Sequence, residues 1–352
     1  MPNNEHDPPL LSKAEFFWIK MQPLLLKRGY RLRPRYDPNW VPSWLQPQPD
    51  GTFLSRWECE DSVRANAHIL DAVRIQDGQK VVFKIVQTKT EELPIACMLS
   101  SESKRRDKRN CSVPILDVIL IPEDDDHALI AMPQLLVFDQ LPFRHVGELC
   151  EAALQLFDGF DFLHENNIVH RDICIANIAM DVSRIIPKGY HFCRWPTHDG
   201  IHHGIEWNTR WSVRPNQYYI IDYGLSQRCD SKSDTVLGVQ GQDRTLPEMS
   251  RIVPYDPFKA DVYQLGKAIK DLMADYFGFE AFSDLIDKMT VKDPALRPTA
   301  AEAAKLCGDL VAQLESSKQL KKRVWKTYDR KKADIRGWYK YAMIAFGWNP
   351  LG

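Results

Sequence analysis

The spacing of hydrophobic residues predicts a small β-sheet in the first part of the chain. Two runs rich in β-branched residues, AHILDAVRI and KVVFKIV, flank the turn-forming letters QDGQ. Runs joined by a turn that contains Asp-Gly favour an antiparallel hairpin. A helical stretch is expected from Thr88 to about residue 110, and the runs ILDVILI and HALIAM on either side of an acidic turn indicate two more strands.

After about residue 146 the hydrophobic spacing becomes helical. Leu149, Ala153, Leu156, Phe160 and Leu163 recur three or four positions apart, as on the buried face of a helix. Strand-rich sequence followed by helix-rich sequence is typical of an α+β protein built as two lobes. We therefore expect a small β-rich lobe, a larger helical lobe, and a functional site in the crevice between them.

The composition is that of a soluble globular protein, with 44% hydrophobic and 26% charged residues among 352. No apolar run approaches the roughly 18–20 uncharged residues that span a bilayer, and the first residues lack the pattern of a secretory signal. The eight cysteines are scattered singly without a CxxC pair, so neither a disulfide framework nor a zinc ribbon is indicated. We expect no transmembrane segment and a cytoplasmic or nuclear location.

Candidate chemistry is concentrated in the letters HENNIVHRDICIANIAMD. There, His170-Arg171-Asp172 precedes Asn177 with four residues between Asp172 and Asn177. Phosphoryl transfer uses such a pair, because a carboxylate must orient the attacking hydroxyl while an amide oxygen holds a metal on the phosphates. Downstream, the apolar run YYIID ends at Asp222, and upstream Lys84 lies inside KVVFKIV. An ammonium in an aliphatic strand is costly unless an anion meets it.

With these four ordered motifs the chain resembles the eukaryotic protein-kinase family over roughly residues 53–312. The letters LPE at 246–248, DVYQLG at 261–266 and RPT at 297–299 match further family marks, the last supplying an arginine that pairs with Glu248. The resemblance implies ATP and Mg as cofactors and a protein as substrate. It also implies roles for individual residues: Asp172 as catalytic base, Lys84 on the α- and β-phosphates, Asn177 and Asp222 as metal ligands, and Arg171 as the reader of a loop phosphate.

The same resemblance places the adenine site at the end of the run HALIAM. Met132 matches the residue that guards the back of the nucleotide pocket, so Pro133, Gln134 and Leu135 would form the hinge. Proline has no N–H, and the hinge remains competent if Leu135 donates its N–H to the base. Beyond the common domain, residues 17–44 and the phrase DAVRIQDGQKVVFKIV resemble a group of fungal kinase-like proteins.

Several positions depart from the family pattern. Ungapped alignment back from Lys84 puts the glycines of the phosphate-covering loop at Ser62, Arg64 and Ala67, so no glycine remains there. Glycine allows the backbone to approach phosphates closely. A lysine of serine/threonine kinases is replaced by Cys174, and the threonine that cooperates with it is replaced by Gly241.

The glutamate that would pair with Lys84 is best matched by Glu92, because apolar residues follow it with the family's spacing. Glu91 and Glu102 are the alternatives. Between Asn177 and Asp222 an insert at about 179–217 replaces a short hairpin, and we expect a folded surface subdomain there. Its histidines and Cys193 fit no recurrent metal-ligand spacing, so we interpret them as structural or exposed rather than as ligands.

These features predict an organisation in four parts: an N-terminal wrapping extension at 1–52, a kinase N-lobe at 53–136, a kinase C-lobe at 137–317, and a basic helical tail at 318–352. Residues 318–340 contain ten Lys or Arg against two Asp, although the whole chain has a formal charge of −1. We expect an amphipathic helix docked on the kinase domain. Nucleic acid or an anionic membrane is the competing partner for this charge.

The function that the sequence favours is ATP-dependent phosphoryl transfer to protein hydroxyls, slow, with serine and threonine favoured over tyrosine. A pseudokinase that acts as a nucleotide-binding or scaffold module is the alternative. A small-molecule kinase of the aminoglycoside-phosphotransferase kind is a minor alternative, which the LPE, DVYQLG and RPT letters disfavour.

Overall fold

The computed structural model describes residues 11–64 and 67–327 of the chain. Its α-helices are α1 Lys13–Lys27, α2 Glu92–Ser100, α3 Glu102–Arg105, α4 Val146–Glu165, α5 Arg210–Val213, α6 Pro257–Met273, α7 Ser283–Met289 and α8 Ala300–Ser316. Its strands are β1 Tyr30–Leu32, β2 Ile69–Arg74, β3 Lys80–Gln87, β4 Asp117–Ile121, β5 Asp124–Pro133, β6 Leu136–Val137, β7 Ile168–Val169, β8 Ile178–Met180, β9 Tyr218–Ile220, β10 Gln227–Arg228, β11 Val236–Gly238, β12 Ser250–Tyr255, β13 Tyr276–Phe277 and β14 Trp325–Lys326.

The N-lobe is built on an antiparallel sheet that has, within the described residues, the order β1-β2-β3-β5-β4. The predicted hairpin is confirmed, since β2 pairs with β3 and Ile69 lies opposite Lys84. The two strands predicted around the acidic turn are β4 and β5, which pair antiparallel. The helical stretch is shorter than predicted and is divided into α2 and α3.

The first strand of this sheet comes from the region predicted as an extended wrapping segment. Tyr30–Leu32 pairs with β2 through a register that places Tyr30 opposite Arg74. Helix α1 packs on the same sheet and buries Trp18, Met21 and Leu25 completely or nearly so. The N-lobe sheet therefore starts well before residue 53.

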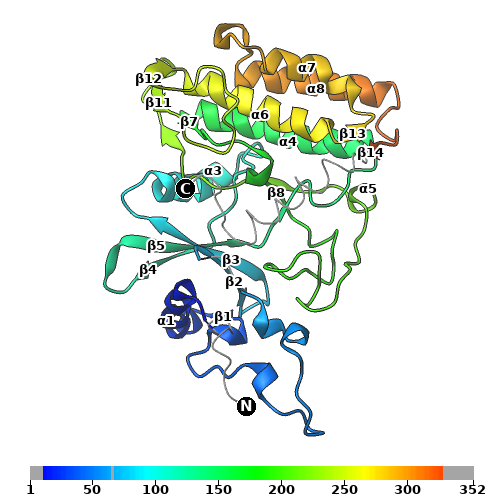
Figure 1. Ribbon diagram of the computed structural model, residues 1–352. Helices are drawn as coiled ribbons and strands as arrows, with labels where there is room; N and C mark the ends of the chain where they lie inside the picture. Colours follow the sequence, from blue (N-terminus) through cyan, green and yellow to red (C-terminus); the bar gives the residue numbers. More distant parts are fainter. Residues whose placement is uncertain (1–10, 65–66, 328–352) are drawn as a thin grey trace.

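Helices form the C-lobe, above the sheet in Figure 1. Helix α4 is the predicted amphipathic helix, and its buried face joins α6, α7 and α8 in one large apolar core. A short sheet of β6, β8 and β9 lies where the lobes meet. The molecule thus has a two-lobed, kinase-like α+β fold, as the sequence predicted.

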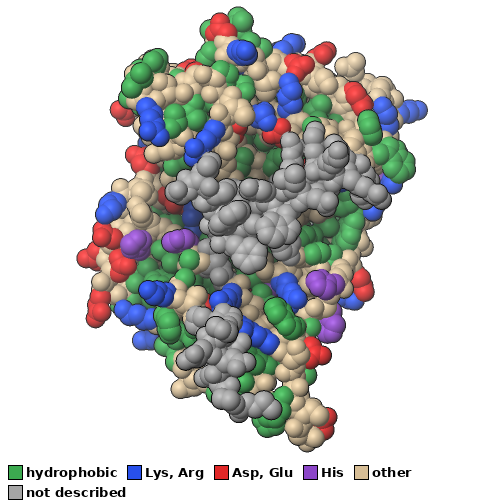
Figure 2. All heavy atoms as spheres, in the orientation of Figure 1, with side chains coloured by type: hydrophobic (Ala, Val, Ile, Leu, Met, Phe, Trp, Pro, Cys, Tyr) green, Lys and Arg blue, Asp and Glu red, His purple; other side chains and the backbone are tan. Residues whose placement is uncertain are grey.

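The insert is the segment between β8 and β9, residues 181–217. Figure 1 shows this green segment descending from the C-lobe beside the N-lobe sheet rather than standing away from the molecule. On the face drawn in Figure 2, charged side chains of both signs are spread over both lobes. Within the described ranges no helix is long and apolar enough to cross a membrane.

The helix predicted for residues 318–340 is wrong for residues 318–327, and the remaining residues of that range lie outside the described part of the chain. Helix α8 ends at Ser316, because Lys318 has a left-handed φ of 58°. The backbone then bonds to the start of α4, where Gly147 N–H donates to Leu320 O, and β14 pairs with β13. The expected docking is seen in another form, since Val324 is 3% exposed.

Candidate active site

The candidate catalytic loop between β7 and β8 is held by one buried carboxylate of α6. Asp261 is fully buried and accepts hydrogen bonds from the backbone N–H groups of His170 and Arg171, both at 2.7 Å. A buried carboxylate with charge-assisted bonds fixes its partners firmly. Arg171 has a left-handed φ of 67°, an unusual conformation that these bonds help to hold. These bonds fix the backbone immediately before Asp172.

Lys84 meets two carboxylates from opposite sides of the cleft. Its Nζ bonds to Glu92 Oε1 on α2 and to Asp222 Oδ1 after β9, the latter at 2.7 Å. The glutamate that reaches Lys84 is therefore Glu92 rather than Glu91 or Glu102. Burial alone would lower the pKa of Lys84, but the charges of Asp222 and Glu92 raise it above its ordinary value, so the ammonium stays charged.

The two acids around Lys84 respond differently to burial. Burial raises the pKa of Glu92 in spite of the Lys84 charge. Burial also acts against ionisation of Asp222, but Lys84 lowers the pKa of that carboxyl below its ordinary value. Asp222 is thus an ionised carboxylate facing the cavity, a suitable group for a divalent cation.

Asp172 and Asn177 lie on the same tight loop, as their spacing indicated. Asn177 Nδ2 donates to Asp172 O at 2.7 Å and to Asp172 Oδ2 at 3.3 Å. The backbone N–H of Gln242 donates to Asp172 Oδ1 at 2.6 Å. The pKa of Asp172 is raised to about 6. Burial is the main cause, the bond from Gln242 opposes it, and the charge of Asp222 acts in the same direction as burial. We call Asp172, Asn177 and Asp222 the floor.

The oxygen atoms that the floor offers suit a magnesium ion. The side-chain nitrogen of Asn177 donates to Asp172, which leaves the side-chain carbonyl oxygen of Asn177 for another partner. Together with the Asp222 carboxylate this gives two oxygen ligands, and Mg²⁺ is commonly held by one or two carboxylates plus phosphate oxygens.

A cavity of about 350 Å³ opens between the lobes beside these residues. Met132, Leu135 and Asn177 line it, with Lys84 and Asp222 at one end. Its size falls at the lower end of the range for small-molecule pockets. Pro133 lies opposite Val81 in the pairing of β3 with β5, and the adjacent Gln134 N–H donates to Lys80 O. Because hydrogen-bonded and non-hydrogen-bonded positions alternate along an antiparallel pair, the Pro133 carbonyl points away from β3. Among the described residues no acceptor meets the Leu135 N–H.

The phosphate-covering loop inferred by ungapped alignment is wrong. Residues 56–62 form the 3₁₀ turns η3 Arg56–Glu58 and η4 Glu60–Ser62 instead of a strand. The strand that precedes β2 in the sheet is β1, and residues 33–68 connect the two. Ser62 and Arg64 therefore belong to a long connection rather than to a tight hairpin, and Ala67 accepts a bond from Trp18 Nε1 at its carbonyl.

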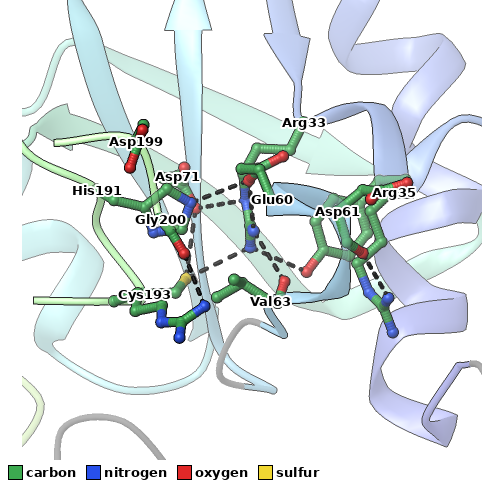
Figure 3. A network of polar contacts seen from close by, with 12 residues as sticks. Arg33, Arg35, Glu60, Asp61, Val63, Asp71, His191, Cys193, Asp199 and Gly200 are labelled. Atoms are coloured by element: carbon green, nitrogen blue, oxygen red, sulfur yellow. Dashed lines mark hydrogen bonds and ion pairs between the residues drawn. The ribbon is translucent and has the colours of Figure 1, made fainter. Parts of the chain in front are cut away.

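The insert is not a separate surface subdomain, because its first half enters the cavity wall. Tyr190, Phe192, Cys193 and Trp195 all line the cavity. Its polar side chains are used internally: His191 Nε2 contacts Glu60 Oε1 at 2.9 Å, as drawn in Figure 3. Among residues 11–64 and 67–327 no group of three or more His, Cys, Asp or Glu side chains is arranged to hold a metal ion.

The activation segment, residues 222–248, closes against the floor. Gly241 has a φ of +106°, and a Cβ there would lie 3.0 Å from Asp172 Oδ1. Arg171 donates to Gln227 Oε1 and Leu237 O, both neutral acceptors. Cys174 is half-buried, and burial raises its pKa to about 12, so it adds no charge where serine/threonine kinases have a lysine.

The segment ends in the ion pair that the resemblance implied. Arg297 is fully buried at its side chain, and its Nη2 donates to Glu248 Oε2 at 2.8 Å. The pair ties the end of the activation segment to the C-lobe.

Sequence reasoning missed three contributors to this site. Asp261 was visible as the first letter of DVYQLG, but its bonds to the catalytic loop were not predicted. Gln242 acts through its backbone N–H, which no side-chain pattern signals. Tyr190 was one aromatic among several in the insert, and only the fold brings its hydroxyl to Leu135 O, at 2.8 Å.

Similarity to known proteins agrees with this geometry. No family model matches the chain. Three serine/threonine-protein kinases are similar to part of it: STY46 of Arabidopsis thaliana, 25% identical over 152 residues, which are 43% of this chain and 20% of that protein; STY17 of Arabidopsis thaliana, 24% over 196 residues, 48% and 28%; and Nek3 of Oryza sativa subsp. japonica, 32% over 164 residues, 45% and 26%.

The chain thus spans between a fifth and under a third of the length of the curated relatives that it matches. These low-identity similarities support a protein-kinase family for the chain.

Proposed function

We propose that the protein transfers the γ-phosphoryl group of ATP to hydroxyls of a protein substrate, slowly, with Asp172 as the base. The observation that carries this proposal is the convergence of Lys84, Glu92, Asn177 and Asp222 on one cavity, with Asp172 hydrogen-bonded to Asn177. Such catalysis depends mainly on positioning and on compensation of phosphate charge. Magnesium, when bound by Asn177 and Asp222, would neutralise phosphate charge.

Within this proposal, Asp172 orients the acceptor hydroxyl and takes its proton, Lys84 binds the α- and β-phosphates, and Met132, Pro133 and Leu135 contact the base. Arg171 couples the loop to the activation segment. Serine or threonine is the proposed acceptor because the similar plant proteins are named serine/threonine kinases. Slowness follows from Cys174, which leaves the γ-phosphate without a neighbouring cation.

The proposed organisation keeps a kinase N-lobe, a C-lobe and the insert, with the N-lobe extended back to include β1. Membership of a fungal kinase-like group, a cytoplasmic or nuclear location, and contact of the basic tail with polyanions stay predictions.

A pseudokinase is the second candidate, and two observations favour it. The Gln242 N–H already occupies Asp172 Oδ1, and no glycine hairpin covers the phosphates within the described sheet. In that case nucleotide binds without transfer.

Thermal-shift titration with Mg-ATP followed by radiolabel transfer separates these candidates. Wild type should be stabilised by millimolar Mg-ATP and should label a generic protein acceptor, whereas Asp172→Asn should bind without labelling. The exposed Asp309→Asn in α8 serves as the matched control. Stabilisation with equal labelling by wild type and Asp172→Asn would assign the activity elsewhere, and stabilisation without any labelling would favour the pseudokinase.

A further inference from the structure

The insert is anchored to both lobes. At its C-terminal end the buried Arg210 donates to Leu141 O at 3.0 Å, which fixes the insert to the C-lobe. At its other end Tyr190 O accepts from Lys80 Nζ at 2.8 Å, a contact to β3 of the N-lobe. The insert therefore bridges the two lobes along one side of the cavity.

A second set of contacts joins the insert to the connection between β1 and β2. Arg33 is the hub, with a side chain only 10% exposed. Its Nη1 donates to Glu60 Oε1 at 3.1 Å and to Val63 O at 2.9 Å, and its Nε forms an ion pair with Asp71 Oδ1 at 3.1 Å. Figure 3 shows Arg33 pointing between Glu60 and Asp71 toward His191 and Cys193 of the insert.

The insert closes this network from its own side. Arg33 Nη2 donates to Cys193 Sγ at 3.4 Å, and His191 shares Glu60 Oε1 with Arg33. Burial opposes ionisation of Glu60, yet the bond from His191 and the charge of Arg33 hold its pKa below the ordinary value, so the network keeps its charges. We call residues 33–64 and 190–200 together the cover.

The cover supplies the aromatic wall of the cavity. Tyr190, Phe192 and Trp195 face it, and the Tyr190 hydroxyl is fixed on Leu135 O. By contrast, Lys84 is the one cation among the described residues that line the cavity, against the carboxylates of Glu92 and Asp222. An aromatic wall binds a flat base well, whereas this charge balance offers little to phosphates without a metal.

We propose that the cover takes the place of a glycine-rich loop and that it makes the nucleoside, rather than the phosphates, the main part of the ligand that is recognised. This inference rests on the proposed nucleotide site and names the part of the ligand that the site selects. It predicts that adenosine binds within about tenfold of Mg-ATP, since the cover residues that line the cavity, Tyr190, Phe192, Cys193 and Trp195, include no cation for the phosphates.

The test is calorimetric titration of the full chain with adenosine and with Mg-ATP. Lys80→Met removes one hydrogen bond at an exposed side chain, so the protein should fold, and both ligands should weaken by the same factor, about fivefold. Arg33→Met should weaken both by at least about tenfold, because it removes several hydrogen bonds of the cover at once. Lys89→Met, an exposed lysine of the N-lobe paired with Asp126, should change neither.

The outcomes separate the two proposals. Mg-ATP binding with adenosine more than about 100-fold weaker would overturn the role of the cover while leaving the nucleotide site intact. Unchanged affinities in Lys80→Met would do the same, even if Arg33→Met fails to fold. Binding of neither ligand by wild type would overturn the nucleotide site and this inference with it.

Discussion

The floor and the cover lie on two sides of one cavity, and they are held in different ways. Asp172 and its neighbours are fixed through backbone bonds to Asp261, deep in the helical lobe. The cover consists of parts of two long connections, which are joined where Arg33 donates to Cys193 Sγ and where His191 contacts Glu60. The difference indicates that the chemistry of the site is set by the fold, whereas its selectivity is set by segments added between strands.

The largest effect is expected for Lys84→Met, which acts on the floor. It leaves Glu92 and Asp222 facing each other without a cation, and it removes the only cation of the described cavity lining. We expect kcat/KM to fall by about 100-fold or more, about 3 kcal/mol in the activation free energy. Steady-state labelling checks this, with Lys89→Met as control. If the mutation raises KM and leaves kcat unchanged, Lys84 would act in ligand binding, as proposed for the cover.

The second largest effect is expected for a change in the cover. Arg33→Met leaves the carboxylates of Glu60 and Asp71 half-buried without their cation, so the free energy of unfolding should fall by about 3 kcal/mol. Arg28→Met breaks the more exposed pair with Asp117 and should cost at most about 1 kcal/mol. Urea unfolding measures both. Equal losses would show that the cover is no firmer than an ordinary surface contact.

A pH profile separates the floor from the cover without mutation. Asp172 must be ionised to take a proton, and its pKa is raised to about 6, so activity should rise with pH through that value. At pH 5 the rate should be about tenfold below its plateau, since roughly one carboxylate in ten is ionised.

The same pKa also fixes the sign of a stability effect. The folded state keeps the Asp172 proton between the ordinary pKa near 4 and about 6, so this group lowers the free energy of unfolding as pH rises through that window. Asp172→Asn should remove that contribution, as urea unfolding at pH 4 and pH 7 would show. A rate profile that is flat from pH 5 to 7 would contradict the assignment of Asp172 as base.

The smallest effect concerns the contact between the floor and the activation segment. Gly241→Ala places a Cβ against Asp172 Oδ1 at a φ of +106°, so the Gln242 bond should weaken and kcat should fall by about fivefold, the cost of one such bond. Nucleotide affinity should stay unchanged. Gly308→Ala in α8, where nothing lies within 4 Å of the added Cβ, should keep full activity. A rise in kcat would instead mark the Gln242 contact as inhibitory.

Local sequence signals account for what was predicted correctly. The hairpin of β2 and β3 and the loop carrying Asp172 and Asn177 each depend on residues a few positions apart, so spacing was informative. Arg33 and Cys193 are 160 positions apart, and no periodicity signals such a contact. The helix expected beyond Ser317 failed over the described residues 318–327 for the same reason, because amphipathic spacing cannot reveal that Leu320 will bond to the start of α4. Similarly, a three-residue strand such as β1 is too short for an alternating pattern.

The connection of 36 residues, 33–68, between β1 and β2 also affects the order in which the N-lobe folds. Closing so long a loop costs about 2 kcal/mol more conformational entropy than closing a hairpin of four residues. Strands β2 and β3, like strands β4 and β5, pair as local hairpins, whereas α1 and β1 contact each other and must find the sheet as a pair. We therefore expect α1 and β1 to dock last during folding and to open first in the native state, with pulse-labelled hydrogen exchange showing later protection for Tyr30–Leu32 than for Lys80–Gln87.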